Sequence, residues 1–249
     1  AVAPLVGGWL FVGAGWHSIF WFLALLSALL WWAVWRALPE TLHASQRHPV
    51  QVGPLLRGYV QMGTSPRFLM LALASGIPFN GMFLYVLSAP VWLGEILQLQ
   101  PTQFFWFFCM SVSGIMLGAW LSGRLAGRIK PKHQIRHGFV IMLGTSLANV
   151  VLNLLGEPHP FWAMLTVSIF SFGWALMVPV VTLLVLDLVP ERRGMASSVQ
   201  AFIGSMANGL VAGVIAPLVM HSASALALTS LGMLCIGVVA WIWVKPRVT

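Results

Sequence analysis

Seven long apolar runs, separated by short polar gaps, limit what this chain can fold into. A helix needs roughly 20 mostly apolar residues to cross the hydrocarbon core of a bilayer, and each run is long enough. With 59% hydrophobic and only 7% charged residues, the chain carries more apolar surface than a water-soluble core can bury. We therefore predict an all-α membrane protein and exclude a soluble enzyme, a disordered chain and a disulfide-stabilised secreted domain. The runs cover residues 18–36, 67–93, 104–126, 134–155, 160–188, 195–219 and 224–244.

The basic residues orient these predicted spans. All 13 Lys and Arg residues fall on one side of the membrane when the runs are taken as successive spans, whereas the opposite side carries only Glu95 and Glu157. Cytoplasmic loops are enriched in Lys and Arg, so the basic side is cytoplasmic. The net charge of +8 therefore reflects the orientation of the chain in the membrane, since the basic residues lie in the gaps between apolar runs. For this reason no nucleic acid is expected as a partner.

An eighth apolar run, residues 1–14, is too short to span a membrane and ends at the turn signal Gly13-Ala14-Gly15. It is not expected to be a signal peptide, because no basic residue precedes Arg36. We expect it to be the end of a truncated helix, with further helices upstream. The longest polar stretch, residues 39–66, contains four prolines and is expected to be a cytoplasmic linker. Residues 54–61 within it are predicted to form an amphipathic helix on the membrane surface.

Short motifs accompany this order of two spans, a linker and six spans. Ala3-Pro4-Leu5-Val6-Gly7-Gly8 resembles the end of an antiporter motif of the major facilitator superfamily, with Ala3 in place of Gly. Gly123-Arg-Leu-Ala-Gly-Arg128 resembles the second copy of that superfamily's cytoplasmic signature loop, with Gly127 in place of the usual Asp. Leu38-Pro39-Glu40-Thr41-Leu42 and the segment from Asp187 to Ser198 resemble its Bcr/CflA-type drug-efflux branch.

The resemblance implies twelve helices in two six-helix bundles, with the substrate site between the bundles and alternating access by rocking. This chain would hold the last eight helices. Residues 1–38 are expected to be the last two helices of the N-terminal bundle, 39–66 the linker and 67–249 the six-helix C-terminal bundle. The resemblance also implies a multi-pass protein of the inner membrane, with membrane lipid among its partners.

Polar and aromatic residues in the middle of the runs 67–93 and 160–188, and two polar residues in the run 195–219, are candidates for the wall of a substrate cavity. Pro78 removes a backbone hydrogen-bond donor and loosens the preceding turn, and aromatic faces bind organic cations in a dry site. Helix packing explains the pattern equally well, with a kink at Pro78 and an amide bonded to a neighbouring helix. The candidates are Phe79, Asn80, Phe83, Trp174, Gln200 and Asn208.

A second set of candidates lies at the cytoplasmic ends of the runs. A carboxylate at the C-terminal end of a helix is disfavoured by the helix dipole, so Asp187 is expected to have a cationic partner among the nearby arginines. Such a pair acts either as a gate or as a hydrated surface pair of little energy. The gating and signature-loop candidates are Gly123, Arg124, Arg128, Asp187, Arg192 and Arg193.

Small residues mark where helices are expected to touch. Gly114 and Gly118 form a GxxxG pair, which brings two helix backbones close together in a membrane. Packing is the favoured interpretation. In the superfamily the helix with this pair faces the fifth helix across the bundle interface, so the pair is also expected to meet Gly7 and Gly8, which follow Pro4 in the antiporter-like motif.

No Asp, Glu, Lys or Arg lies near the centre of a predicted span. Because ionisable groups at that depth mark ion paths, the carboxylate for proton coupling is expected in the missing upstream helices. His133 and His137 have a spacing that suits a metal, but neighbouring cations repel one, and we expect neither a metal nor another cofactor. No nucleophile–base set, carboxylate pair or phosphate loop is present, so no enzyme is expected.

The leading hypothesis is a secondary transporter that exports small amphipathic compounds or drugs by proton antiport. One alternative is an exporter of amino acids or sugars with the same fold. A charged substrate favours a buried counter-charge, and its absence here favours neutral or lipophilic cargo. The other alternative is a non-transporting membrane fragment that needs another chain.

The predicted topology can be tested by cysteine labelling. A reagent that cannot cross the membrane is expected to label a Glu157→Cys variant from outside, because this residue lies in an outer loop. The same reagent is expected to label a Lys132→Cys variant only after the membrane is opened. The reverse pattern of labelling would contradict the topology.

Overall fold

The computed structural model describes residues 6–7, 9–10, 13–39, 52–156 and 159–248. These ranges contain helices and turns and no strand. They include seven helices that are long and apolar enough to cross a membrane, which confirms the predicted all-α membrane class. The chain divides into two compact units, residues 1–55 and 56–249.

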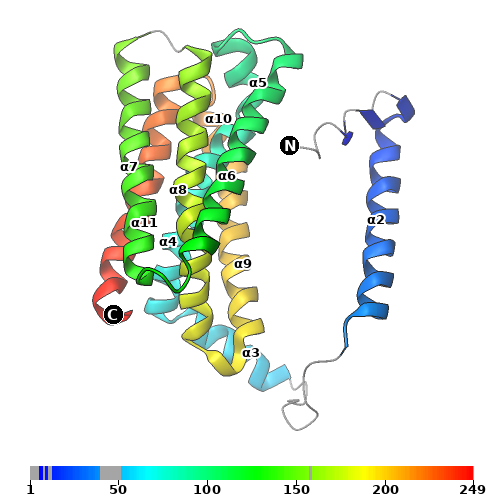
Figure 1. Ribbon diagram of the computed structural model, residues 1–249, viewed down its shortest axis with the longest axis vertical. Coiled ribbons are helices and arrows are strands. Elements are labelled where there is room, and N and C mark those ends of the chain that lie inside the picture. Colours follow the sequence, from blue (N-terminus) through cyan, green and yellow to red (C-terminus); the bar gives the residue numbers. More distant parts are fainter. Residues whose placement is uncertain (1–5, 8, 11–12, 40–51, 157–158, 249) are drawn as a thin grey trace. The chain divides into compact units, whose positions relative to one another are not determined.

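In the first unit, α2 (Trp16–Ala37) is the long helix (Figure 1). The predicted turn before it is present: Gly15 has a φ of 76°, a left-handed conformation that glycine adopts at little cost. The Ser18 hydroxyl donates hydrogen bonds to the carbonyl oxygens of Leu10, at 2.9 Å, and Gly15, at 2.6 Å. No residue of α2 is buried, so its apolar surface is available to lipid or to other helices.

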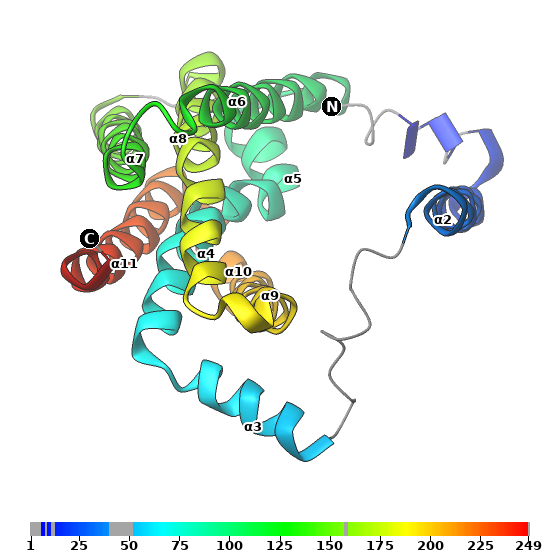
Figure 2. The same cartoon turned by 60° about the horizontal axis from the view of Figure 1, so that its bottom comes forward.

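The second unit is a bundle of long helices preceded by α3 (Val52–Gly63) (Figures 1 and 2). The long helices are α4 (Pro66–Leu87), α6 (Phe104–Leu125), α7 (Pro131–Leu155), α8 (Pro160–Asp187), α9 (Arg193–Leu210) and α11 (Ala223–Val248). The short elements are α5 (Ala89–Val91), the π-helix η2 (Trp92–Ile96), the 3₁₀-helices η3 (Pro101–Gln103) and η4 (Pro190–Arg192), the π-helix η5 (Val211–Ile215) and α10 (Ala216–Val219).

Two of the predicted runs are interrupted. The run 67–93 leaves α-helical geometry after Leu87, and the run 195–219 passes through η5 before it ends. Pro217 explains the second interruption, because a proline ring crowds the carbonyl four residues earlier, and that residue, Gly213, lies inside η5. Pro78 and Pro179, in contrast, lie inside the continuous helices α4 and α8.

The bundle is organised around α8, which packs against α4, α6, α7 and α9 (Figure 2). Gly114 and Gly118 of α6 face it, and a Cβ atom on either glycine would overlap a backbone carbonyl oxygen of α8, that of Ser168 or of Phe172. The Ser168 hydroxyl also donates to the Met110 carbonyl at 2.6 Å. This side of α6 is therefore occupied by α8. The contact expected with Gly7 and Gly8 stays a prediction, because Gly8 lies outside the described residues.

Buried polar side chains connect the helices in two places. Near one end of α7, Gln134 Nε2 donates to Ser122 Oγ of α6 at 2.7 Å and to the Leu176 carbonyl of α8 at 2.9 Å. Near the other end, Asn149 Nδ2 donates to the Tyr85 hydroxyl of α4 at 2.7 Å, and the Thr166 hydroxyl of α8 donates to Asn149 Oδ1 at 3.2 Å. Such bonds hold membrane helices together because lipid offers no competing partner.

The close contact between α6 and α8 predicts a specific sensitivity to side-chain size. Replacing Gly118 with Leu forces the two backbones apart and is expected to lower the free energy of unfolding by about 1–3 kcal/mol, the usual cost of overpacking. The measurement is equilibrium unfolding in mixed micelles, followed by tryptophan fluorescence.

Gly144 is the matched control. It also lies within a long helix, α7, but a Cβ atom placed there would meet no other atom within 4 Å. Gly144→Leu is therefore expected to change the free energy of unfolding by less than about 0.5 kcal/mol. Equal losses in the two variants would contradict the proposed packing.

Candidate functional site

An open cavity of about 330 Å³ lies between α4, α8 and α9 of the second unit. Four of the six residues singled out from the sequence line it: Phe79, Trp174, Gln200 and Asn208. None of the lining residues is charged. The remaining lining residues are Ala72, Ser75, Gly76, Val178, Ser197, Ala201 and Gly204.

Aromatic rings form one wall of the cavity. The rings of Phe79 and Trp174 tilt against each other with their centroids 5.0 Å apart, and Phe79 stacks on Phe83 at 5.6 Å. Trp174 Nε1 donates a hydrogen bond to the Ser75 carbonyl at 3.0 Å, which fixes the indole against α4. The indole face is thus held in place at the cavity, and aromatic faces of this kind bind both apolar groups and organic cations.

Amide groups form the wall contributed by α9. Gln200 Nε2 donates to the Ser75 hydroxyl at 3.3 Å, and this hydroxyl donates in turn to the Ala72 carbonyl at 3.1 Å. Two turns further along α9, Asn208 Oδ1 is buried and accepts no hydrogen bond from any described residue. A buried acceptor without a donor is costly. Because this oxygen is buried, a ligand in the cavity reaches it only after the Asn208 side chain turns toward the cavity.

Asn80 and Phe83 are not among the residues that line this cavity. Asn80 has only 1% of its surface exposed, and its Nδ2 donates to the Gly76 carbonyl of the same helix at 3.0 Å. It therefore bonds neither to a neighbouring helix nor across the cavity. Phe83 lies one turn beyond Phe79 and supports its ring by stacking.

Sequence analysis missed Ser75, which connects all three helices around the cavity. Its carbonyl accepts from Trp174 of α8 and its hydroxyl accepts from Gln200 of α9. Ser75 is buried. The available signal was a hydroxyl residue one position before Gly76, in the middle of an apolar run.

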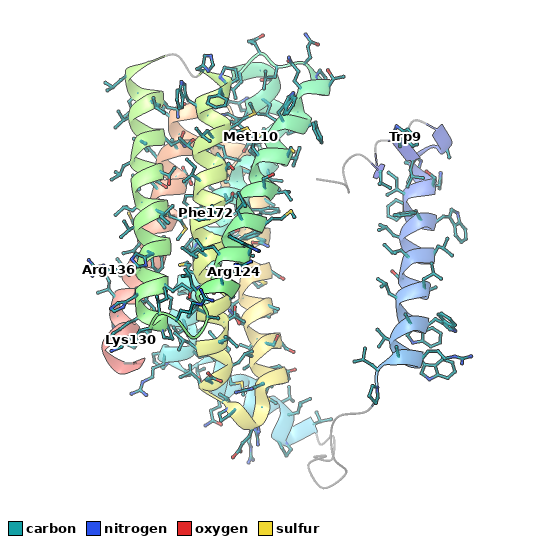
Figure 3. The ribbon with its side chains drawn as sticks, viewed as in Figure 1. Trp9, Met110, Arg124, Lys130, Arg136 and Phe172 are labelled. Atoms are coloured by element: carbon teal, nitrogen blue, oxygen red, sulfur yellow. The ribbon has the colours of Figure 1, made fainter. Side chains whose placement is uncertain are left out.

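At the cytoplasmic end, the cationic partner expected for Asp187 is Arg193. The Arg193 Nη2 atom lies 2.7 Å from Asp187 Oδ1, and both side chains are more than half exposed. Among the described residues, no other arginine forms an ion pair. Arg124 lies over the ring of Trp120 at 4.8 Å. It is in the same half of the bundle as Lys130 and Arg136, and Met110 is in the other half (Figure 3).

The other candidates show few contacts. Gly127 has a φ of 75° and allows the sharp turn after α6, next to the signature-like residues Gly123 and Arg128. Of the antiporter-like motif, Gly7 is helical, and Pro4 and Gly8 lie outside the described residues.

Comparison with known proteins agrees with the superfamily and the drug-efflux branch that the sequence motifs resemble. The profile of the Major Facilitator Superfamily matches residues 1–217. The chain is 22% identical to the Bicyclomycin resistance protein homolog of Haemophilus influenzae, over 99% of this chain and 62% of that relative. It is 28% identical to the Uncharacterized MFS-type transporter YdgK of Bacillus subtilis, over 88% and 54%, and 25% identical to the Multidrug transporter MdfA of Yersinia pestis (strain Angola), over 82% and 50%.

The chain thus spans between one half and two thirds of the length of these curated relatives. The relatives carry the names of transporters and resistance proteins, and the resemblance to the drug-efflux branch is confirmed. With seven candidate spans, the protein is a multi-pass protein of the inner membrane. The profile match covers most of the chain, and the chain therefore belongs to the Major Facilitator Superfamily.

Proposed function

We propose that this chain is part of a secondary transporter that exports small amphipathic compounds across the inner membrane by alternating access. The observation that carries the proposal is the uncharged cavity between α4, α8 and α9, with an aromatic wall and an amide wall. Its place among membrane-spanning helices matches where transporters of this type bind their substrates.

The chemistry of the cavity favours neutral or lipophilic cationic cargo. The rings of Phe79 and Trp174 offer dispersion contacts, and a cation over such a ring gains about 0.5–2 kcal/mol. Gln200 and Asn208 line the other wall, and their side-chain amides offer directional contacts to polar groups of the cargo. An amino acid or a sugar acid would need a buried counter-charge, which these walls lack. The names of the relatives, bicyclomycin resistance and multidrug transport, support drug-like cargo.

Protons are the proposed coupling ion. Antiport requires a group that binds a proton at membrane depth in one state and releases it in the other. The described spans carry no Asp, Glu, Lys or Arg near their centres, so we place this group on helices that the relatives have outside the matched region. The cavity described above would then bind cargo, and the proton would bind elsewhere in the complete transporter.

The domain boundaries belong to the same proposal. Residues 1–38 complete the N-terminal bundle, 39–66 link the bundles, and 67–249 form the C-terminal bundle that rocks against the first. Gly123, Arg124, Arg128, Asp187, Arg192 and Arg193 lie on the cytoplasmic face, where the bundles would close.

Trp174 tests the proposed cargo site. In the complete transporter, Trp174→Ala removes the aromatic face and is expected to raise the KM for a fluorescent lipophilic cation about tenfold, the equivalent of about 1.4 kcal/mol. Trp174→Phe keeps a ring and is expected to lose less. The measurement is efflux from cells that lack other drug pumps, with membrane abundance checked by immunoblotting.

Trp162 is the matched control for this experiment. It is exposed near the start of α8 and does not line the cavity. Trp162→Ala is expected to leave the KM within about twofold of wild type. If Trp174→Ala also leaves efflux unchanged, the cavity does not bind the cargo and the proposed function is wrong.

Asp187 tests the proposed gate. A gate must stabilise one state of the transporter more than the other. The pair with Arg193 does so if it forms only when the cytoplasmic side is closed. Asp187→Asn is then expected to reduce efflux at normal abundance, and the charge swap Asp187→Arg with Arg193→Asp is expected to restore it in part. Unchanged efflux in Asp187→Asn would leave an exposed pair worth about 0–1 kcal/mol and no gate.

A further inference from the structure

A second and larger cavity, of about 480 Å³, lies at the cytoplasmic end of the second unit. It is enclosed by α3, the start of α4, the end of α8 and η4. It shares no lining residue with the cavity proposed to bind cargo. Its lining residues are Gly58, Gln61, Met62, Ser65, Arg67, Phe68, Leu188, Val189, Glu191 and Arg192.

Two arginines give this cavity a positive charge. In the part of the chain that the structure describes, no carboxylate oxygen lies within 4.0 Å of the guanidinium group of Arg67 or Arg192. Glu191 lines the same cavity and forms no ion pair with a described residue either. The lining therefore carries a net charge of about +1 near neutral pH, and its two guanidinium groups have unused hydrogen-bond donors.

Gly58 shapes the cavity by letting α3 come close to the turn between α8 and α9. A Cβ atom placed on Gly58 would lie 2.6 Å from Met195 Sδ and 3.1 Å from Arg192 Nη1. The Arg192 guanidinium thus lies directly against the backbone of α3. A side chain at this position would have to displace the end of the Met195 side chain and the Arg192 guanidinium, so Gly58 keeps the space beside Arg192 open.

The cavity lies at the depth of lipid headgroups. The apolar spans α4 and α8 reach their cytoplasmic ends at Pro66 and Asp187, on the side of the membrane that carries the basic residues. On α3, the buried residues Gly58 and Met62 face the bundle, whereas Leu56 and Val60 are 58% and 63% exposed. A helix with an exposed apolar stripe at this level lies in the membrane interface.

We propose that this cavity binds the headgroup of an anionic phospholipid of the cytoplasmic leaflet. A phosphodiester carries one negative charge, which matches the net charge of the lining, and guanidinium groups form strong, charge-assisted hydrogen bonds with phosphate oxygens. Gln61 and Ser65 offer further hydrogen bonds. Met62, Phe68, Leu188 and Val189 provide apolar surface for the glycerol and the first acyl carbons. Basic pockets between membrane helices on the cytoplasmic side bind lipid headgroups in this way.

A bound lipid would connect the start of α4 to the turn between α8 and α9. Arg67 is the second residue of α4 and Arg192 ends η4, so one phosphate between them links the N-terminal end of one span to the segment that follows the C-terminal end of another. The proposal does not depend on the identity of the cargo, because the two cavities are lined by different residues.

Lipid binding can be measured on the purified 249-residue chain by native mass spectrometry, with phosphatidylglycerol or phosphatidylcholine added to the detergent. We expect the chain to bind the first phosphatidylglycerol more tightly than phosphatidylcholine. Arg67→Gln and Arg192→Gln are each expected to weaken this binding about fivefold, and the double variant about 25-fold, since a basic residue near an anionic lipid contributes about a factor of five.

Arg136→Gln is the matched control. Arg136 is an exposed arginine of α7 near the same end of the bundle and does not line the cavity (Figure 3). Its replacement is expected to change the affinity less than twofold. A loss in Arg136→Gln as large as in Arg67→Gln would show attraction to the surface as a whole and would overturn the proposal.

Gly58→Leu separates cavity shape from charge. The variant keeps both arginines but fills the space beside Arg192, and it is expected to lose most of the preference for phosphatidylglycerol while its melting curve shows a folded bundle. Wild-type binding in this variant would overturn the proposal. Equal binding of the two lipids, together with competition by inorganic phosphate at constant ionic strength, would assign the cavity to free phosphate and overturn the lipid assignment.

Discussion

The close approach of α8 to its neighbours is the contact on which the rest of the bundle depends. Lipid is as apolar as a leucine side chain, so no hydrophobic force drives these helices together, and close packing and hydrogen bonds must do so. Gly114 and Gly118 let α6 touch the α8 backbone, and Gln134 bonds α7 to the Leu176 carbonyl of α8. With α8 fixed on these sides, its remaining side can line an open cavity.

The walls of that cavity differ in how firmly they are held. α8 buries residues along most of its length, and α4 buries eleven, whereas α9 buries only Ala196 and Val199. Segments with few buried contacts open at lower free energy than the core. The aromatic wall is therefore the more firmly held part of the cavity, and the amide wall with Gln200 and Asn208 is the part that moves at lower cost.

The sequence predicted the spans well and the side-chain contacts poorly, for one physical reason. A run of apolar residues predicts a membrane helix, and each of the seven runs is found as a candidate span whose ends differ by a few residues from those predicted. Such a helix is apolar all around, so its sequence does not reveal which face meets protein and which meets lipid. Trp174 was found because it lies near the middle of its run, away from the interfacial ends where tryptophans gather, and Gln200 because it is a polar amide within an apolar run. The role of Ser75 as a shared partner depends on Trp174 and Gln200, neighbours that only tertiary structure provides. Asn80 instead bonds to Gly76 of its own helix, and the sequence does not distinguish this local bond from one to another helix.

The π-helix η5 has a further consequence for the span formed by α9, η5 and α10. A π-turn accommodates about one residue more than the α-helix around it, and one residue corresponds to a rotation of about 100° in an α-helix. The side chains of residues 216–219 therefore point in directions about 100° away from those they would have if residues 193–219 formed one continuous α-helix. If η5 tightened into α-helical geometry without losing a residue, Ala216 and the residues after it would rotate relative to the face that carries Asn208. Deleting one residue inside η5 has the opposite effect: it removes the surplus and keeps both faces where they are. The span can thus tolerate a one-residue deletion between Val211 and Ile215, whereas the same deletion between Gln200 and Asn208 would rotate these two lining residues relative to each other.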